Sequence, residues 1–403
     1  MRQKVERQGE DMTNKVGMIP ANERTNERTN VIVGDCLESL KNLPPQSVNC
    51  IVTSPPYYGL RDYGTGEWVG GNPECPHYRT SKVSENTATG HKAMMESGNA
   101  VGDAIYKTVC PLCGAVRVDK QIGLEETPQE YINRLVMVFR ECKRVLRDDG
   151  TLWLNIGDSY WGSGSRWYDF TGKFTEASKI QSGSQGTINL SNIPKLVGNH
   201  NGIKNKDLIG IPWMLAFALR DDGWYLRQDI IWHKPNPMPE SVKDRCVKSH
   251  EYIFLLSKKA KYYFDYEAIQ EDAKWKNDSR GGKGRIAYEG KRTDGGAEQK
   301  AQQSFVKISN KRNKRDVWSV TTKAVKEAHF ATFPEDLIEP CILAGSKKGQ
   351  TVLDPFCGSG TTGIVSVRNE RNFIGIELNP EYAEMSIRRI EKEESQGIQM
   401  AFA

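Results

Sequence analysis

The segment Thr53-Ser54-Pro55-Pro56-Tyr57 carries side chains and backbone groups that suit chemistry on an amino group. Its two prolines fix φ and remove two backbone N–H donors, so the loop offers mainly carbonyl oxygens and the Ser54 hydroxyl as acceptors. An amino group donates hydrogen bonds to such acceptors, which can aim its lone pair at an electrophile. An exposed Tyr57 would add a flat aromatic face for stacking. This segment is the predicted active site.

A second segment, Asp354 to Thr362 with the sequence DPFCGSGTT, has the composition of a turn that binds a nucleoside. A predicted buried strand precedes it and a helix follows, and its glycines let the backbone approach a ligand closely. Glu377 ends the next predicted strand about twenty positions further on, where an acidic side chain suits ribose hydroxyls. The chain has no Gly-Lys-Ser/Thr phosphate loop, which disfavours ATP. The combination predicts a nucleoside cofactor.

Four metal-binding side chains, Cys75, His77, Cys110 and Cys113, lie in a stretch with few apolar residues. Cys-x-x-Cys-Gly is a common zinc knuckle, and four sulfur and nitrogen ligands suit tetrahedral Zn²⁺. A segment with so little apolar content needs a staple in order to fold. We therefore predict a structural zinc site, with His91 as an alternative fourth ligand. Unligated surface residues are the competing interpretation.

Apolar runs and helix signals predict the elements that position these segments. Strands are expected at 31–33, 48–52, 151–156, 226–232, 252–256, 351–353 and 373–376, and helices at 36–43, 128–147, 207–220, 334–344, 361–368 and from 380 onward. The strands 226–232 and 252–256 should pair as a hairpin. Strands that alternate with helices indicate a mostly parallel sheet that is covered on both faces.

Together the Ser54-Pro-Pro-Tyr57 loop and the DPFCGSG turn resemble the amino DNA methyltransferases, and most closely the beta class, in which the catalytic loop precedes the cofactor loop. The resemblance covers residues 31–58, 124–158, 207–258 and 328–394. It implies an α/β fold, namely a circularly permuted class I (Rossmann-like) methyltransferase sheet with a zinc-binding insertion and a DNA-recognition insertion. It also implies S-adenosylmethionine as cofactor and double-stranded DNA as partner.

The same resemblance implies roles for individual residues. The implied cofactor-binding residues are Asp35, Cys36, Thr53, Phe333, Asp354, Phe356, Cys357, Gly358, Ser359, Gly360, Thr361 and Glu377. Within this set, Glu377 would bind the ribose and Asp35 the adenine, while Cys357 is not expected to act as a nucleophile. Ser54 and the carbonyl of Pro55 would hold the target amino group. The target-base pocket would comprise Tyr57, stacked on a flipped base, with Trp232, His233, Lys234 and Asn236 as its other wall.

Ser54 also bears on the identity of the target base. In this family a Ser at that position tends to accompany methylation of cytosine N4, while an Asp tends to accompany methylation of adenine N6. We therefore predict cytosine N4 as the target, with adenine N6 as the alternative.

The stretch from Lys274 to Arg315 holds thirteen Lys or Arg against four Asp or Glu, although the whole chain carries a formal charge of only +5. A polyanionic partner is the natural interpretation of such an excess, and a solvated basic loop is the alternative. In the beta class the target-recognition region occupies this position, here residues 259–327. The Gly- and Ser-rich residues 160–205 are interpreted either as a second DNA-contacting element or as a disordered loop.

These segments predict how the chain is divided. We expect a mobile arm at 1–30, a catalytic half at 31–258 with a zinc-binding insertion at 59–122 and a flexible loop at 160–205, a recognition region at 259–327, a cofactor-binding half at 328–394 and a tail at 395–403.

Composition excludes several classes of protein. A mean hydropathy of −0.61 and the lack of a long apolar run exclude a membrane-spanning protein. The polar N-terminus predicts that there is no signal peptide, and hence a cytoplasmic protein, in which nine cysteines argue against a disulfide framework. We expect a monomer or a homodimer. Because no nuclease motif is evident, any restriction endonuclease that works with it would be a separate protein.

Two other functions compete with this interpretation. Methyltransferases that act on protein glutamine or on RNA have related Pro-Pro-Tyr loops, but they usually place the cofactor loop first. A non-catalytic, zinc-containing DNA-binding protein on a methyltransferase scaffold would have no need for intact Ser54, Tyr57, Asp354, Glu377 and Asp35.

Overall fold

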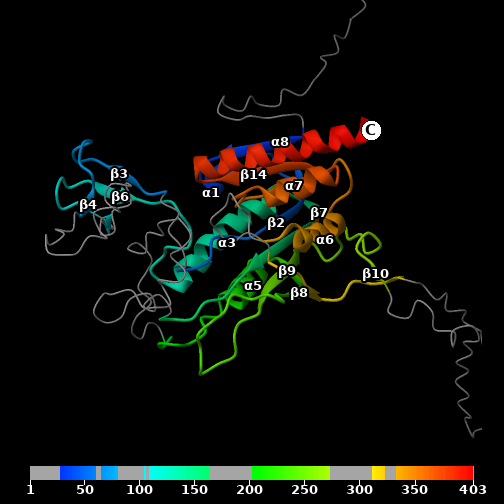
Figure 1. The fold of residues 1–403 in the computed structure, drawn as a ribbon, viewed down its shortest axis with the longest axis horizontal. Coiled ribbons are helices and arrows are strands. Elements are labelled where there is room, and N and C mark those ends of the chain that lie inside the picture. The colour runs from blue at the N-terminus through cyan, green and yellow to red at the C-terminus, as the bar shows by residue number, and fades with distance from the viewer. Residues whose placement is uncertain are drawn as a thin grey trace, which may run out of the picture.

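A computed structural model describes residues 28–59, 65–79, 104–105, 109–162, 202–272, 311–322 and 333–402 of the chain. Its centre is an eight-stranded sheet (Figure 1). In spatial order the strands are β1 (Thr29–Val33), β14 (Asn372–Glu377), β13 (Thr351–Asp354), β2 (Val48–Thr53), β7 (Leu146–Ile156), β9 (His250–Ser257), β8 (Tyr225–His233) and β12 (Val317–Ser319). Only β9 runs antiparallel to its neighbours in this sheet, so the predicted mostly parallel sheet is confirmed.

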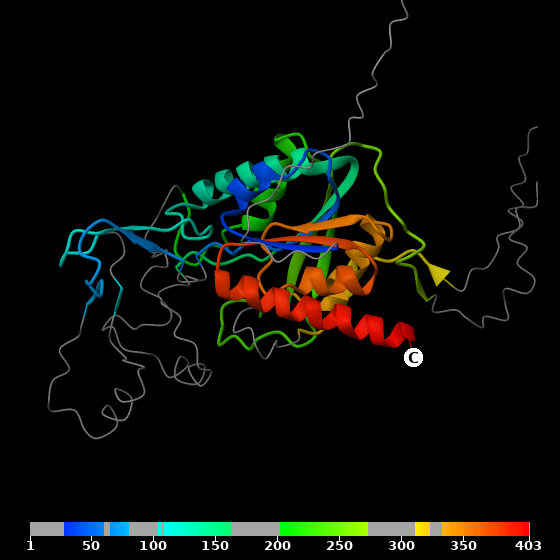
Figure 2. The same ribbon diagram turned by 90° about the horizontal axis from the view of Figure 1, so that it is seen from above.

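Helices cover both faces of the sheet (Figure 2). One face is covered by α1 (Cys36–Asn42), α3 (Pro128–Val145) and α5 (Ile211–Asp221), and the other by α6 (Glu335–Gly345), α7 (Thr361–Arg368) and α8 (Pro380–Phe402). Alternation along β2 shows the two sides, because Ile51 packs with α1 and α3 while Cys50 and Val52 pack with α6. The layers are those expected from alternating strands and helices.

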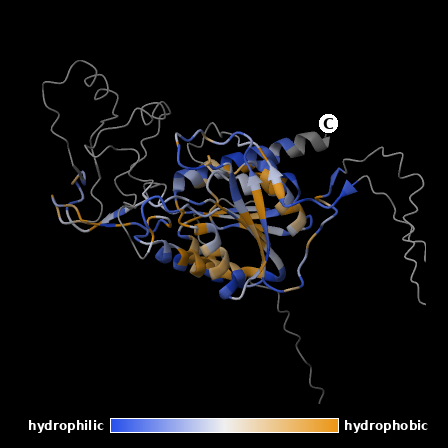
Figure 3. Ribbon diagram, turned by 90° about the horizontal axis from the view of Figure 1, so that it is seen from below, coloured by the Kyte–Doolittle hydropathy of each residue, from blue (hydrophilic) through white to orange (hydrophobic). Residues whose placement is uncertain are grey.

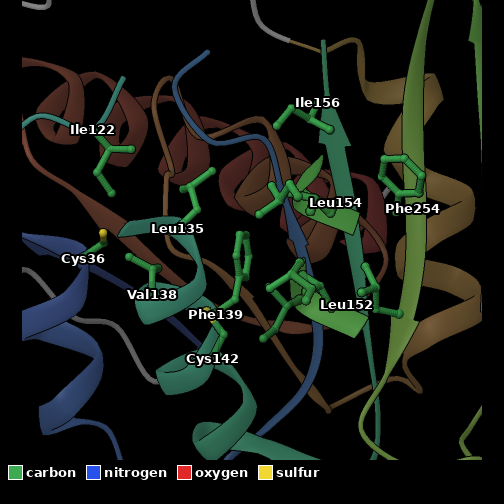
Figure 4. Close-up of a cluster of buried hydrophobic side chains, with 14 of the residues drawn as sticks. Cys36, Ile122, Leu135, Val138, Phe139, Cys142, Leu152, Leu154, Ile156 and Phe254 are labelled. Atoms are coloured by element: carbon green, nitrogen blue, oxygen red, sulfur yellow. The ribbon is translucent and has the colours of Figure 1, made fainter. Parts of the chain in front are cut away.

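The longest helix on the first face is α3, and local contacts define where it begins. Thr127 caps α3 by accepting the backbone N–H of Glu130, whose side chain accepts the N–H of Thr127 in return. Pro128 occupies the first turn, where its missing N–H costs nothing. Apolar residues then recur on one side and pack against β7 and β9, and this cluster includes Cys36 of α1 (Figure 4). Apolar residues are concentrated in the same strands and helix faces in Figure 3.

The predicted zinc-binding insertion contains small sheets of its own. Strand β3 (Glu67–Val69) pairs with β6 (Val116–Val118), and β4 (Tyr78–Arg79) pairs with β5 (Ala104–Ile105). They lie to one side of the main sheet in Figure 1. The backbone N–H of Gly59 donates to the carbonyl of Gly123 at 2.9 Å, so the insertion leaves and rejoins the body at one point.

Parts of the predicted recognition region belong to the main sheet. Tyr262 and Phe264 pack against the cluster beneath α6, and β12 pairs with β8. In the sequence, the antiparallel pair β10 (Glu271–Asp272) and β11 (Lys311–Arg312) lies between Phe264 and β12. Glu271 accepts hydrogen bonds from the backbone and the side chain of Arg315. Within the predicted recognition region, residues 273–310 and 323–327 lie outside the described residues.

Other predicted boundaries also change. Helix α8 continues to Phe402, so the predicted tail at 395–403 is wrong for most of its length, and β1 begins at Thr29, inside the predicted arm. Most of the arm and of the loop at 160–205 lies outside the described residues, as does His91. None of the helices in the described ranges combines the length and apolar character needed to cross a bilayer.

Candidate active site

The two chemical segments follow strands that lie side by side. Strand β13 pairs with β2 through Val352 with Cys50 and Leu353 with Ile51. From β13 the chain proceeds to β14 on one side, whereas from β2 it proceeds to β7 on the other. In open α/β sheets such a reversal opens a crevice at the carboxyl ends of the strands, which is where ligands bind. The two loops therefore meet at one edge of the sheet.

A buried carboxyl joins the two loops. Asp354 at the end of β13 is 1% exposed, and its Oδ1 accepts from Thr53 Oγ1 at 2.6 Å and from the backbone N–H of Phe356 at 3.1 Å. Its Oδ2 accepts from Thr362 Oγ1 at 2.7 Å. Burial raises the pKa of Asp354 to about 6, although these hydrogen bonds lower it. Asp354 and Thr53, both predicted as cofactor ligands, therefore act on the site by holding its loops together.

The glycine turn leaves space for a ligand. Gly358 and Gly360 have φ of 53° and 80°, in the left-handed region that favours glycine. A Cβ at Gly358 would have only the carbonyl of Phe356 within 4 Å, whereas one at Gly360 would collide with Ser386 at 2.7 Å. The backbone at Gly358 is thus open to a ligand, while Gly360 serves close packing of α7 against α8. Ser359 and Thr361 are buried, as is Cys357, whose thiol pKa is raised well above its ordinary value by burial.

Two acidic side chains flank this turn at the ends of β1 and β14. Glu377 accepts from the backbone N–H of Gly358 at 2.8 Å and of Asn379 at 2.9 Å, and burial raises the pKa of Glu377. A carboxylate has about four acceptor sites, so Glu377 keeps some capacity for a hydroxyl donor. Asp35 caps α1 by accepting the N–H of Glu38 at 3.0 Å. The side chain of Cys36 points instead into the core, so it offers a cofactor only its backbone (Figure 4).

Tyr57 is held more firmly than the sequence suggested. Its ring is half-buried, and its hydroxyl donates to Glu251 Oε2 at 2.7 Å and lies 3.3 Å from Asn155 Oδ1. Burial and the Glu251 carboxylate raise the pKa of Tyr57 well above its ordinary value, so the hydroxyl stays protonated. The carbonyl of Pro56 accepts from Tyr131 at 2.8 Å. We expected an exposed Tyr57, and this is wrong for the edge of the ring that carries the hydroxyl.

The four predicted residues of the other pocket wall differ in position. Trp232 is buried, and its indole N–H donates to the carbonyl of Val320 at 2.8 Å. His233 Nδ1 lies 3.0 Å from Ser319 Oγ, and Asn236 exchanges two hydrogen bonds with the backbone of Thr322. Of these four residues, Lys234 alone contacts the group of side chains around the Tyr57 hydroxyl, where it forms an ion pair with Glu251.

The four predicted metal ligands come together. The ligand atoms of Cys75, His77, Cys110 and Cys113 all lie within 4.8 Å of one another. The sulfurs of Cys75 and Cys110 are 3.7 Å apart, close to the edge of about 3.8 Å that tetrahedral zinc with bonds of about 2.3 Å requires. The ring of His77 stacks on Trp68 with centroids 4.6 Å apart. The donor set and its spacing suit zinc.

Comparison with known proteins identifies the family. A family profile described as DNA methylase, of the N6/N4 type, matches residues 48–388. The type II methyltransferase M.Cfr9I of Citrobacter freundii is 42% identical over 370 residues, which cover 92% of this chain and 90% of that protein. The chain belongs to the N6/N4 DNA methylase family. This methylase is thus an S-adenosylmethionine-dependent type II DNA methyltransferase.

One further related sequence and one solved structure are also similar to the methylase. The type II methyltransferase M.SmaI of Serratia marcescens is 40% identical over 360 residues, or 89% of this chain and 90% of that protein. Among solved structures, the PvuII DNA methyltransferase (cytosine-N4-specific) aligns over 92% of each chain with a TM-score of 0.49 and 16% identity.

The residues around Tyr57 in the methylase include two that motif reasoning missed. Glu251 stands near the start of β9 and Asn155 near the end of β7, and neither belongs to a recognisable motif. A signal for Glu251 was present, because alternation places it on the same face as buried Ile253 and Leu255. A charge on such a face needs a partner, and here Lys234 provides it.

The Asp354 carboxyl should make the stability of the methylase depend on pH. Its folded-state pKa of about 6 exceeds the ordinary value of 3.8, so the folded protein holds this proton to higher pH than the unfolded chain does. This group therefore lowers the free energy of unfolding as pH rises from about 4 to about 6. Asp354→Asn removes that contribution. The free energy of unfolding of the variant minus that of wild type should therefore rise by about 3 kcal/mol between pH about 4 and about 6.

Chemical denaturation at a series of pH values measures this gain. Asp221→Asn, the same exchange at an exposed position, serves as the control for the substitution itself. A constant difference between Asp354→Asn and wild type would show that the carboxyl does not titrate in this range.

Proposed function

We propose that this methylase transfers a methyl group to the exocyclic N4 of cytosine in double-stranded DNA. The observation that carries the proposal is the position of the acceptor-rich loop Ser54 to Tyr57 beside the open turn at Gly358. Asp354 holds both loops, so groups bound by each would lie next to one another. This arrangement supports binding of a base amino group and a nucleoside cofactor side by side at the carboxyl ends of β2 and β13.

The residues present suit S-adenosylmethionine. The spare acceptor capacity of Glu377 suits the ribose hydroxyls, the open backbone at Gly358 suits close approach of the methionine part, and Asp35 lies at the neighbouring strand end for the adenine. Half-buried Phe356 and Phe333 would supply apolar walls. When bound, the cofactor supplies an electrophilic methyl group.

The catalytic loop holds and orients the target amino group. A base in a duplex is out of reach, so it must be flipped out at a cost of a few kcal/mol. Stacking on Tyr57 would offset about 1–3 kcal/mol of that cost. The Ser54 hydroxyl and the Pro55 carbonyl would accept hydrogen bonds from the amino group and favour positive charge that develops on its nitrogen. No covalent enzyme intermediate is required.

Ser54 favours cytosine N4, and adenine N6 is the alternative. Unmethylated DNA incubated with the protein and cofactor, then digested to nucleosides, should yield N4-methylcytosine by mass spectrometry. N6-methyladenine would instead establish the alternative. Absence of either product would favour a non-catalytic DNA-binding protein on the same scaffold.

The remaining predictions complete the proposed organisation. The strand carrying the cofactor turn is near the C-terminal end of the described chain yet pairs with β2, which supports a circularly permuted class I sheet. The Cys75–Cys113 cluster would hold a structural zinc ion. Residues within the recognition region 259–327 would contact DNA, and a separate restriction endonuclease would share the recognition sequence.

A further inference from the structure

We propose that Glu251 is a positioning residue for the target base, because it fixes the ring of Tyr57 through the tyrosine hydroxyl. The inference rests on the proposed stacking of the base on Tyr57. It assigns a function to a side chain outside both loops and outside every motif in the sequence.

Glu251 is the centre of a compact set of polar contacts. One oxygen, Oε2, accepts from the Tyr57 hydroxyl at 2.7 Å and lies 3.4 Å from Asn155 Nδ2. The other oxygen, Oε1, is paired with Lys234. Asn155 is itself held by a hydrogen bond from Nδ2 to the carbonyl of Tyr252 at 3.1 Å. Each oxygen of Glu251 therefore has a partner, which leaves the carboxylate few alternative rotamers.

The charges in this set compensate one another. The side chains of Glu251 and Lys234 are only 14% and 19% exposed, so an unpaired charge at either position would be costly. Lys234 lies over the ring of Trp232 at 4.3 Å from its centroid, and Trp232 is fixed to Val320. The ammonium group is thus held between the Trp232 ring and the Glu251 carboxyl, which it pairs with directly. The predicted role of Lys234 at the base pocket becomes an indirect one.

A second contact fixes the ring of Tyr57 itself. A Cβ added at Gly157 would lie 2.6 Å from Cε2 of Tyr57, so only glycine allows the ring to lie against this backbone. Gly157 follows β7, and Glu251 stands on β9, the neighbouring strand in the sheet. Two points on the rigid sheet, one at the hydroxyl and one along the ring edge, thereby set the plane of a side chain that belongs to a loop.

A fixed plane matters because the target nitrogen must reach the methyl group with the correct alignment. Displacement of a reacting group by about 1 Å can lower the rate about 100-fold. A Tyr57 ring free to rotate about its side-chain bonds would still offer a stacking surface, but the base would be misaligned. Loss of Glu251 should therefore reduce kcat more than it weakens binding of DNA or cofactor.

The experiment compares Glu251→Ala, Glu251→Gln, Tyr57→Phe and the double variant Tyr57→Phe/Glu251→Ala. Rates are measured with unmethylated plasmid DNA and radiolabelled cofactor, and cofactor affinity by calorimetry. Glu251→Ala and Tyr57→Phe each remove the same hydrogen bond and should each lower kcat about 10- to 100-fold. The double variant should be no slower than the slower single variant. Glu251→Gln keeps an acceptor for Tyr57 but removes the counter-charge of Lys234, so it should be less impaired in kcat than Glu251→Ala. Exposed Glu391→Gln should match wild type.

Several outcomes would overturn the proposal. Unchanged kcat in Tyr57→Phe would do so even if Glu251→Ala failed to fold, and so would losses that multiply in the double variant. A Glu251→Ala defect confined to KM or to cofactor affinity would indicate a general structural role instead. Tyr57→Ala distinguishes base stacking on Tyr57 from the positioning role of Glu251. If this variant keeps full activity, the proposed base stacking fails. If it is inactive while Glu251→Ala is normal, only the role of Glu251 fails.

Discussion

Tyr57→Ala should abolish detectable methyl transfer while cofactor binding persists. The substitution removes the stacking surface, about 1–3 kcal/mol for a flipped base, and also the alignment that this surface provides. We expect a fall in kcat of at least about 100-fold, since misalignment alone can have that effect. Ser54→Ala removes one acceptor for the amino group and should lower kcat about 100-fold as well. The affinity for cofactor should stay within about twofold in both variants, because neither side chain lies at the glycine turn.

Tyr58 provides a matched control for this prediction. It is the next residue, is 1% exposed, and its hydroxyl donates to the carbonyl of Glu126 at 3.1 Å rather than to Glu251. Tyr58→Phe should therefore lose some stability and retain nearly all activity per folded molecule. Methyl-transfer assays with radiolabelled cofactor, together with calorimetry of cofactor binding, distinguish these cases. Full activity in Tyr57→Ala or in Ser54→Ala would show that the base pocket has been assigned to the wrong loop.

Removal of one cysteine from the metal cluster should unfold the insertion without unfolding the sheet. Purified protein should contain one zinc ion per chain, and Cys113→Ser should contain none. Binding of structural zinc contributes about 10–16 kcal/mol in small peptides, far more than the few apolar contacts of β3 and β6 can replace. We expect rapid proteolysis within residues 59–122 of the variant, while the main thermal transition changes little.

Cys246→Ser is the control for this experiment, because Cys246 is exposed and lies outside the cluster. It should keep its zinc and its resistance to protease. Elemental analysis and limited proteolysis with mass spectrometry measure both properties. Zinc-free wild-type protein, with Cys113→Ser as protease-resistant as wild type, would contradict a structural metal site.

The elements that position the site could be predicted because local signals and tertiary packing agree. The helical periodicity over 128–147, the buried apolar runs and the two loops each point to one structure. The pairing of β13 with β2 was not predicted, because two loops at the carboxyl edge of one sheet need not follow neighbouring strands. The four residues of the cluster were predicted as metal ligands from their pattern and their apolar-poor surroundings, with His91 as an alternative fourth ligand.

What could not be predicted depends on contacts between distant parts of the chain. Asp354 was predicted as a cofactor ligand, and its hydrogen bond from Thr53, about 300 residues earlier in the chain, was not foreseen because nothing local to the motif indicates it. Trp232 was expected in a pocket wall but packs beneath Val320, because β12 adds to the edge of the sheet. A three-residue strand within a basic stretch gives no periodic signal.

The hydrogen bond between Gly59 and Gly123 has a consequence for how this protein can change. The insertion begins at Gly59 and ends at Gly123, and these two residues are joined by this backbone hydrogen bond. Loop closure costs rise only slowly with length, so the insertion can lengthen, shrink or be exchanged with little effect on the sheet. The segment that carries the Cys75–Cys113 cluster can in this sense be replaced as a unit, and it begins two residues from Tyr57, so new contacts could be brought to the reaction site without redesigning the fold.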